Sequence, residues 1–118
     1  MVQDAMDVSD QLEPLGISAE VIDPRTVSPL DMPTILDSVK KTSRAVVIHE
    51  AVRTSGIGAE IAATISDEAF DFLDAPVKRV GAPFTPVPFA PVLEEAYLPG
   101  CEEILDAVAE IFPERGVR

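Results

Sequence analysis

The chain has 118 residues, of which 47% are hydrophobic and 25% are charged, and its formal net charge is −12. This length suits one domain with its own core rather than two. The negative charge argues against nucleic acid and anionic membranes as partners, because such a surface repels phosphate groups. We therefore expect a basic protein partner, although the same charge could serve only to keep the domain soluble.

Cysteine and histidine each occur once, as Cys101 and His49, which limits several kinds of chemistry. A single cysteine cannot form an internal disulfide, so the composition indicates an intracellular protein. One histidine and one cysteine cannot supply a usual zinc ligand set, and we expect no metal site. No apolar run approaches the roughly 20 residues needed to span a bilayer, and none resembles a signal peptide. The expected location is the cytoplasm, or the mitochondrial matrix in a eukaryote.

Helical and extended patterns alternate along the first part of the chain. Residues 1–15 have a loose helical spacing of apolar side chains, and Gly16 is typical of the position just past a helix. Residues 17–23 are predicted to form a short strand. The next helix is predicted to begin after Asp31 as its cap, because Pro33 then falls where no backbone N–H is needed. Its buried face is predicted to contain Ile35, Leu36 and Val39.

The second part of the chain contains two further strand patterns and two helical patterns. Residues 44–48 form an apolar run typical of a strand that is covered on both faces of a parallel sheet. A helix is predicted over 57–73, with the core positions Ile57, Ile61, Ile65 and Phe70. A short strand is predicted over 77–80, and the five prolines within 81–99 predict neither a helix nor a central strand. A last helix over 101–112 is expected to bury Ile104, Leu105, Val108 and Ile111.

This alternation of strands and helices is typical of an α/β fold, in which helices cover both faces of a parallel sheet. The chain opens on a helix, however, and it offers only three clear strand patterns, which is few for such a sheet. A further strand preceding Met1 would explain the deficit.

The turn after the 44–48 strand is the most site-like local feature. It lies at the carboxyl end of a parallel strand, where open α/β sheets bind ligands, and it leads into a helix amino terminus that could hold an anion. Arg53, Gly56 and Gly58 are therefore weak candidates for an anion site or an interface. Two glycines fall short of a dinucleotide-binding fingerprint, and they could instead let the helix approach the sheet closely.

His49 and Glu50 follow the same strand and are weak candidates for an interface or for acid–base chemistry. Neighbouring residues on a strand point to opposite faces, so the two side chains need not cooperate. The nearby serine and threonine residues have no second histidine to activate them. Cys101 has no base or second cysteine beside it, and we expect it to be structural. The residues therefore indicate no catalytic, cofactor-binding or metal-binding group in this chain.

Four stretches in order carry a more specific signal. They are 16–32 (GISAEVIDPRTVSPLDM), 46–63 (VVIHEAVRTSGIGAEIAA), 72–81 (FLDAPVKRVG) and 85–99 (TPVPFAPVLEEAYLP). Together they resemble the carboxy-terminal domain of the transketolase superfamily, and within it the β subunit of the E1 component of pyruvate and branched-chain 2-oxo acid dehydrogenases. The sequence departs from that family pattern at Pro24, Ser55 and Phe84, where leucine, glycine and aspartate are usual.

The resemblance implies a three-layer α/β/α domain with one more strand just before the first helix. It also implies an oxidoreductase, the E1 enzyme of oxidative decarboxylation, of which residues 1–118 would be one domain within a longer β subunit. Thiamine diphosphate and magnesium would be held between the α subunit and the amino-terminal domain of β. This chain would therefore bind neither, and it would not be catalytic alone. It would contribute association with the α subunit and with a second β subunit.

The resemblance also assigns one partner-binding residue. Asp74, in FLDAP, is similar to an acidic contact for the basic peripheral subunit-binding domain of E2, the acyltransferase core of the multienzyme complex. Asp74 could instead only cap the turn before the next strand. Two other interpretations of the chain stay open: a domain of another transketolase-type enzyme, or a free-standing interaction module without catalytic activity. The residues do not distinguish pyruvate, branched-chain 2-oxo acids and acetoin as substrates.

Overall fold

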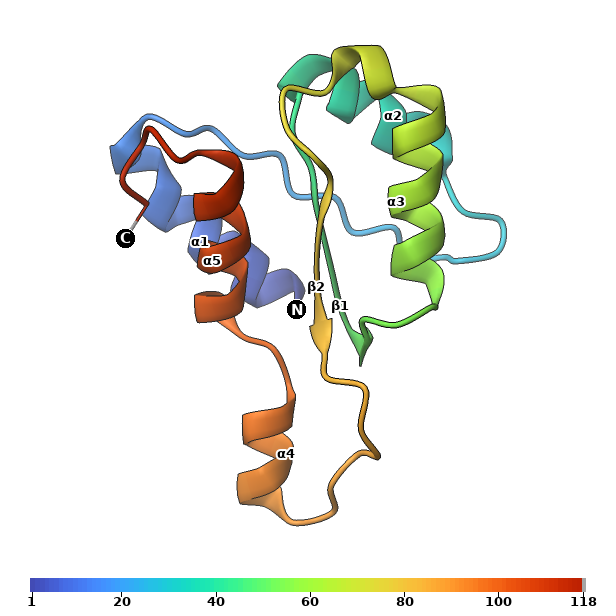
Figure 1. Cartoon of the computed structure of the whole chain (residues 1–118), viewed down its shortest axis with the longest axis vertical. Coiled ribbons are helices and arrows are strands. Elements are labelled where there is room, and N and C mark those ends of the chain that lie inside the picture. Colours follow the sequence, from blue (N-terminus) through green and yellow to red (C-terminus); the bar gives the residue numbers. More distant parts are fainter. Residues whose placement is uncertain (118) are drawn as a thin grey trace.

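The computed structural model describes residues 1–117, which form a small parallel sheet between two layers of helices (Figure 1). Its elements in chain order are α1 (Val2–Leu12), the 3-10 helix η1 (Glu13–Leu15), α2 (Met32–Thr42), β1 (Val46–Val52), α3 (Ile57–Glu68), the 3-10 helix η2 (Phe70–Phe72), β2 (Lys78–Ala82), α4 (Pro91–Tyr97) and α5 (Cys101–Ile111). Helices α1 and α5 cover one face of the sheet, and α2 and α3 cover the other. The predicted three-layer α/β/α fold with a parallel sheet is confirmed.

The sheet consists of β1 and β2, paired in parallel with Val46 opposite Lys78. The register shifts between Ile48 and Val52, so the carboxyl end of β1 is irregular. Both strands were predicted, but each reaches further toward its carboxyl end than the apolar pattern indicated. Residues 46–48 are half-buried rather than fully enclosed, because the sheet is only two strands wide.

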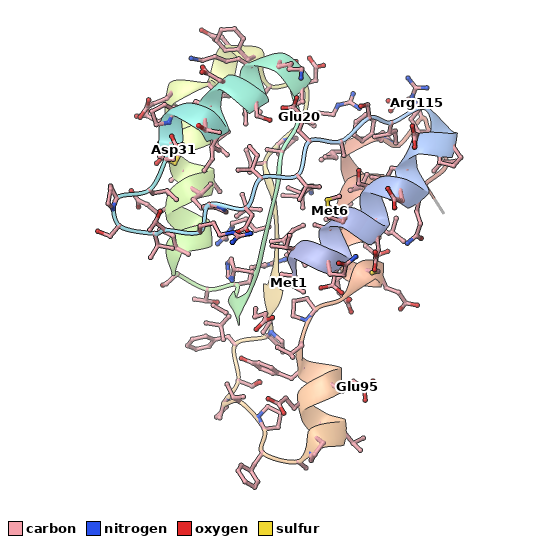
Figure 2. All side chains as sticks on the ribbon, turned by 180° about the vertical axis from the view of Figure 1, so that it is seen from behind. Met1, Met6, Glu20, Asp31, Glu95 and Arg115 are labelled. Carbon is pink, nitrogen blue, oxygen red and sulfur yellow. The ribbon has the colours of Figure 1, made fainter. Side chains whose placement is uncertain are left out.

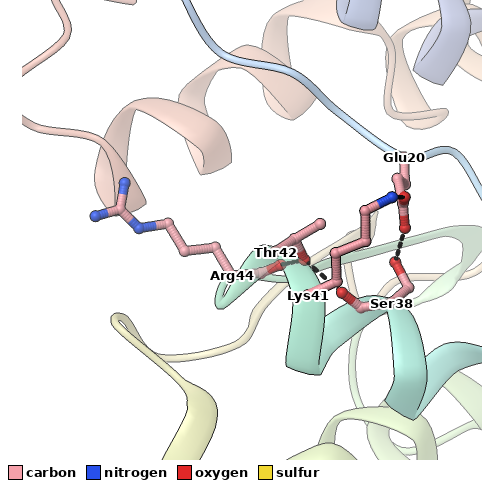
Figure 3. Close-up of polar contacts among 5 residues, drawn as sticks. All are labelled: Glu20, Ser38, Lys41, Thr42 and Arg44. Atoms are coloured by element: carbon pink, nitrogen blue, oxygen red, sulfur yellow. Dashed lines mark hydrogen bonds and ion pairs between the residues drawn. The ribbon is translucent and has the colours of Figure 1, made fainter.

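The third predicted strand, residues 17–23, is a coil, and this prediction was wrong. The segment crosses the molecule from the end of η1 toward α2 (Figure 1). Ile17 is buried, whereas the Glu20 carboxylate accepts hydrogen bonds from the Ser38 hydroxyl at 2.7 Å and from the Lys41 ammonium group (Figure 3). Within residues 1–117 no backbone N–H of 18–23 pairs with a strand, whereas the backbone N–H of Ile17 donates to the Leu12 carbonyl at 3.2 Å.

The ends of α2 follow the local sequence signals. The Asp31 carboxylate accepts hydrogen bonds from the backbone N–H of Thr34 at 3.2 Å and from its hydroxyl at 2.7 Å, as a helix cap does. Pro33 lies in the first turn, and Ser43 ends the helix with a φ of 62°. The predicted cap and the buried residues Ile35, Leu36 and Val39 are confirmed.

Helix α3 is shorter than predicted. It ends at Glu68 because Ala69, with φ −128° and ψ 18°, leaves the helical conformation, and η2 follows. Ile61 and Ile65 are buried as predicted, whereas Ile57 and Phe70 are exposed, and these two core assignments were wrong. Phe70 no longer lies on the helical stripe once the helix has ended, and 72% of its surface is exposed.

Helix α4 corrects the prediction that residues 81–99 contain no helix. Pro91 opens this seven-residue helix, at a position where the missing N–H of proline is no loss. Helix α5 was predicted. At its amino terminus the Glu103 carboxylate accepts a hydrogen bond from the backbone N–H of Gly100 at 2.8 Å. Its residues Ile104, Val108 and Ile111 are buried as expected, but Leu105 is only half-buried.

Two separate apolar cores lie on the two faces of the sheet. The first unites α1 and α5 through Val8, Leu12, Ile17, Val80, Ile104, Ala107 and Val108. The second unites α2 and α3 through Ile35, Leu36, Val39, Ile61, Ile65 and Ala69. Alternation along the first strand divides its residues between them, because Val46 and Ile48 pack on the first core and Val47 packs on the second. Among residues 1–117, no helix is both long and apolar enough to cross a membrane.

Candidate functional site

His49 lies on the α3 side of the sheet, and two glycines make room for its ring. A Cβ atom added at Gly58 of α3 would lie 2.3 Å from the imidazole, and one at Gly81 of β2 would lie 3.0 Å from it. The same Cβ at Gly81 would also lie 2.8 Å from the carbonyl oxygen of Ala51. The ring is therefore enclosed by backbone on two sides, and neither glycine can gain a side chain without displacing it.

Both ring nitrogens of His49 are buried, and neither has a hydrogen-bond partner within the described residues. An acid–base role needs a neighbouring group that exchanges a proton, and residues 1–117 provide none within hydrogen-bond reach of this ring. The imidazole packs between β1, β2 and α3.

Glu50 lies on the opposite side of the strand, toward α1. It is exposed, and it contributes to raising the pKa of the Met1 amino group, after the larger effect of the hydrogen bond between that group and Asp4. The structure therefore separates Glu50 from His49 and does not bring them together as an acid–base pair.

Arg53 and Gly56 shape the turn between β1 and α3. The backbone N–H of Arg53 donates to the Ala82 carbonyl at 2.9 Å, and its own carbonyl accepts from the Arg79 guanidinium at 2.8 Å. Gly56 precedes α3 with a φ of 77°, in the left-handed region that favours glycine. The Arg79 guanidinium thus lies at the backbone of this turn, and neither Arg53 nor Arg79 lines the cavity described below.

Asp74 lies in the bend between η2 and β2, on the surface. Its backbone N–H donates to the Ser43 carbonyl at 2.8 Å, which ties the bend to the end of α2. Its carboxylate has no hydrogen bond or ion pair with any residue of the 1–117 range. The backbone position is thus fixed by the fold, and the residue is exposed.

An apolar cavity of about 400 Å³ lies beside β1. It is bounded by residues 17–24, by residues 45–48 and by side chains of both helix layers, among them Leu12, Ile65 and Val108. The cavity therefore lies where a further strand of the sheet would lie next to β1. Within residues 1–117, no three His, Cys, Asp or Glu side chains gather in a way that could hold a metal ion.

Sequence reasoning missed the cavity, the contact of His49 with Gly81, and the exposed apolar surface of residues 83–99. The available signals were Gly81 at the end of a predicted strand and six large apolar residues within 84–98 that follow no helical period. None of these signals predicts which residues contact one another in the folded chain.

The family described as "Transketolase, C-terminal domain" matches residues 1–104. The chain therefore belongs to the transketolase C-terminal domain family, which confirms the resemblance seen in the sequence. It is 48% identical over 113 residues to the acetoin:2,6-dichlorophenolindophenol oxidoreductase subunit beta of Bacillus subtilis, a match that covers 96% of this chain and 33% of the relative.

Two pyruvate dehydrogenase subunits are also similar to this chain over nearly its whole length. The E1 component subunit beta of Bacillus subtilis is 47% identical over 111 residues, covering 94% of this chain and 34% of the relative. The mitochondrial E1 component subunit beta of Dictyostelium discoideum is 41% identical over 111 residues, a match that covers 94% of this chain and 31% of the relative. The chain thus spans about a third of the length of the curated relatives it matches.

Proposed function

We propose that the chain is the carboxy-terminal domain of the β subunit of a thiamine diphosphate-dependent 2-oxo acid dehydrogenase E1, within an oxidoreductase complex. Its role there is subunit association and docking of the E2 acyltransferase. The carrying observation is the identity of 47–48% to two β subunits along nearly the whole chain. Residues 1–118 are accordingly proposed as one domain of a longer subunit, in the cytoplasm or the mitochondrial matrix.

Thiamine diphosphate and magnesium are proposed to act in the assembled enzyme and to be bound outside this domain. The proposal is supported by the surroundings of His49, whose ring nitrogens are buried within the domain itself. The substrate is left open between pyruvate, a branched-chain 2-oxo acid and acetoin, because no residue of this chain is proposed to contact it. The pyruvate and acetoin relatives are also almost equally similar to it.

Asp74 is proposed as the contact for the peripheral subunit-binding domain of E2. Its exposed carboxylate has no partner in the described chain, and its backbone is held by Ser43. A domain of net charge −12 would steer a basic partner toward such a carboxylate and accelerate the encounter. The remaining proposed partners are the E1 α subunit and a second β subunit.

The proposal is tested by titrating the chain in a calorimeter with two ligands separately. The peripheral subunit-binding domain of E2 should bind, and thiamine diphosphate with magnesium should give no heat of binding. Binding of the cofactor in the micromolar range, together with no binding of the E2 domain, would contradict the proposal.

A further inference from the structure

The turn that joins α3 to β2 carries an exposed aromatic and acidic surface. Phe70 and Phe72 of η2 are 72% and 47% exposed, and residues 66–76 (SDEAFDFLDAP) contain four carboxylates and no basic side chain. The turn precedes β2 and lies beside the end of α2, whereas the chain leaves the other end of β2 toward α4 (Figure 1). Figure 2 shows Glu20, which contacts the last turn of α2, well apart from Glu95 on α4.

Phe72 and Asp74 point to the same side of this turn. Leu73 between them has an extended backbone, with φ −84° and ψ 125°, and successive side chains of an extended segment point in opposite directions. Leu73 packs against the α2–α3 core, so its two neighbours face away from that core, and both are exposed. The backbone N–H groups of Leu73 and Asp74 donate to the carbonyls of Phe70 at 3.1 Å and of Ser43 at 2.8 Å. An aromatic ring and a carboxylate are thus held in place side by side.

The Phe72 ring lies under a cation of the chain itself. The Nζ atom of Lys40, in the last turn of α2, is 5.9 Å from the centroid of the ring. This separation is close to the limit of about 6 Å for a cation–π contact. Lys40 is exposed, and within residues 1–117 it forms no ion pair. The ring can therefore exchange this ammonium group for another cation.

Another part of the chain shows what such a pair of groups binds. Phe112 and Glu114 have the same spacing as Phe72 and Asp74, and both contact the Arg44 guanidinium. The guanidinium carbon lies 3.9 Å from the centroid of the Phe112 ring, and Nη1 lies 3.4 Å from Oε1 of Glu114. Arginine suits this arrangement better than lysine, because its planar group can stack on a ring and donate to a carboxylate at once. Phe72 and Asp74 combine the same two kinds of group, but no guanidinium of residues 1–117 contacts them.

We propose that Phe72 and Asp74 form a binding site for an arginine side chain of a basic protein partner, and that Lys40 occupies the ring until that arginine replaces it. The inference rests on the proposed function, in which the partner is the peripheral subunit-binding domain of E2 and Asp74 is its contact. It adds the stacking half of the site, a preference for arginine over lysine, and a competing residue within the chain. The four carboxylates of residues 66–76 give this surface the charge that attracts such a partner.

The first test measures binding of the peripheral subunit-binding domain of E2 to variants of the chain by calorimetry. Phe72→Leu should weaken binding about 10-fold, because leucine keeps apolar bulk but offers no π face to a guanidinium. Phe70→Leu is the matched control, since no cation of residues 1–117 lies over this exposed ring of the same turn, and it should bind like the wild type. Both melting temperatures should stay near that of the wild type. If the E2 domain binds the wild type and Phe72→Leu equally, the inference is wrong and the proposed function stands.

The competing role of Lys40 has its own pair of variants. Lys40→Gln should strengthen binding of the E2 domain about 3-fold, because the ring is then vacant when the arginine arrives. Lys41→Gln is the control, since it removes the same charge from the same turn of α2, but its ammonium group contacts Glu20 instead of the ring. Equal strengthening by both substitutions would reveal a general effect of charge and would overturn the role of Lys40.

Two small probes test the preference for arginine without the partner. N-acetyl-arginine amide and N-acetyl-lysine amide are titrated separately at millimolar concentrations while the ring resonances of Phe72 are followed by NMR. The arginine compound should shift these resonances saturably, and the lysine compound should shift them much less. Equal shifts with both compounds, or none with either, would overturn the inference whether or not the E2 domain binds. Absence of E2 binding together with a clear arginine preference would contradict the proposed function and leave the arginine site supported.

Discussion

The contact of Gly58 with His49 couples two residues that the sequence places nine positions apart. The imidazole fills the space in which a side chain at position 58 would lie, because a Cβ atom there would be 2.3 Å from the ring. Gly81 lies against the ring on its other side, so the imidazole cannot move away in that direction. The conformation of Gly58 itself is helical, so steric contact rather than backbone strain makes glycine necessary here.

Gly58→Ala should therefore lower the free energy of unfolding by about 1–3 kcal/mol, the usual cost of overpacking. The control is the same substitution in a His49→Ala background. There the space is free, and alanine should be neutral or slightly stabilising, because it favours a helix more than glycine does. Urea denaturation of the four proteins measures the coupling. Equal losses in both backgrounds would show that the imidazole is not the obstacle.

Asp74 is predicted to act through its charge and not through the fold. Asp74→Asn keeps the shape of the side chain, so the melting temperature should stay near that of the wild type. Affinity for the peripheral subunit-binding domain of E2 should fall by roughly 1–3 kcal/mol, and the loss should shrink at high salt because an exposed ion pair is screened. Calorimetry at two salt concentrations measures this. A lower melting temperature with unchanged affinity would make the residue structural.

At the scale of the elements, α2 depends on its cap. The pKa of Asp31 is lowered, because its carboxylate accepts hydrogen bonds from the hydroxyl and the backbone N–H of Thr34. A carboxylate whose pKa is lower in the folded state stabilises the fold above its unfolded pKa, and this stabilisation is lost as the pH falls through the folded pKa. The affected window is therefore the acid range, from the ordinary aspartate pKa near 3.8 downward.

Asp31→Ala should lower the melting temperature at pH 7, and Asp37→Ala, an exposed change on the same helix, should leave it nearly unchanged. Asp31→Asn should retain the melting temperature at pH 7, since asparagine also caps a helix. In Asp31→Asn the melting temperature should also fall less in acid than it does in the wild type. Thermal unfolding followed by circular dichroism from pH 7 to about pH 2 distinguishes the three variants. A similar decline in Asp31→Asn and in the wild type would assign the pH dependence to other carboxylates.

The helices were more predictable from the sequence than the other elements, for a physical reason. A helix satisfies its own backbone, so local signals such as the Asp31 cap and Gly16 define where it begins or ends. A strand needs a hydrogen-bonded neighbour. Residues 17–23 have the right alternation and lie beside the free edge of β1, but within the described chain their backbone does not bond to it. Phe70 was misplaced because one residue, Ala69, ends α3 before the apolar stripe does.

The candidate site was predictable only in part. Proximity in sequence suggested Arg53, Gly56, His49 and Glu50 as one group, and the structure places Glu50 on the opposite side of the strand from His49. The role of Gly58 follows from a contact between a helix and a strand, which no local pattern encodes. The position of Asp74 in a bend could be predicted from the nearby Pro76, whereas the exposure of its carboxylate depends on how η2 and β2 pack in the fold.

At the scale of the whole molecule, the cavity beside β1 has consequences for association. One edge of β1 is paired with β2, and the other faces apolar side chains and a coil that does not bond to it. Unpaired strand edges and uncovered apolar surface both favour contact with another chain. We therefore expect a dimer or a larger species at micromolar concentrations. A clean monomer in sedimentation velocity experiments at high micromolar concentration would contradict this.

The division of the apolar interior into two cores also determines how the domain opens. The α1–α5 core and the α2–α3 core meet only across two strands, so one layer can detach while the other stays packed. In native-state hydrogen exchange, the amides of α1 and α5 should form one cooperative group and those of α2 and α3 another, each with its own opening free energy. The paired amides of β1 and β2 should exchange slowest, because they are released only when both layers have opened. A single opening energy shared by all helices would show instead that the narrow sheet transmits the loss of one core to the other.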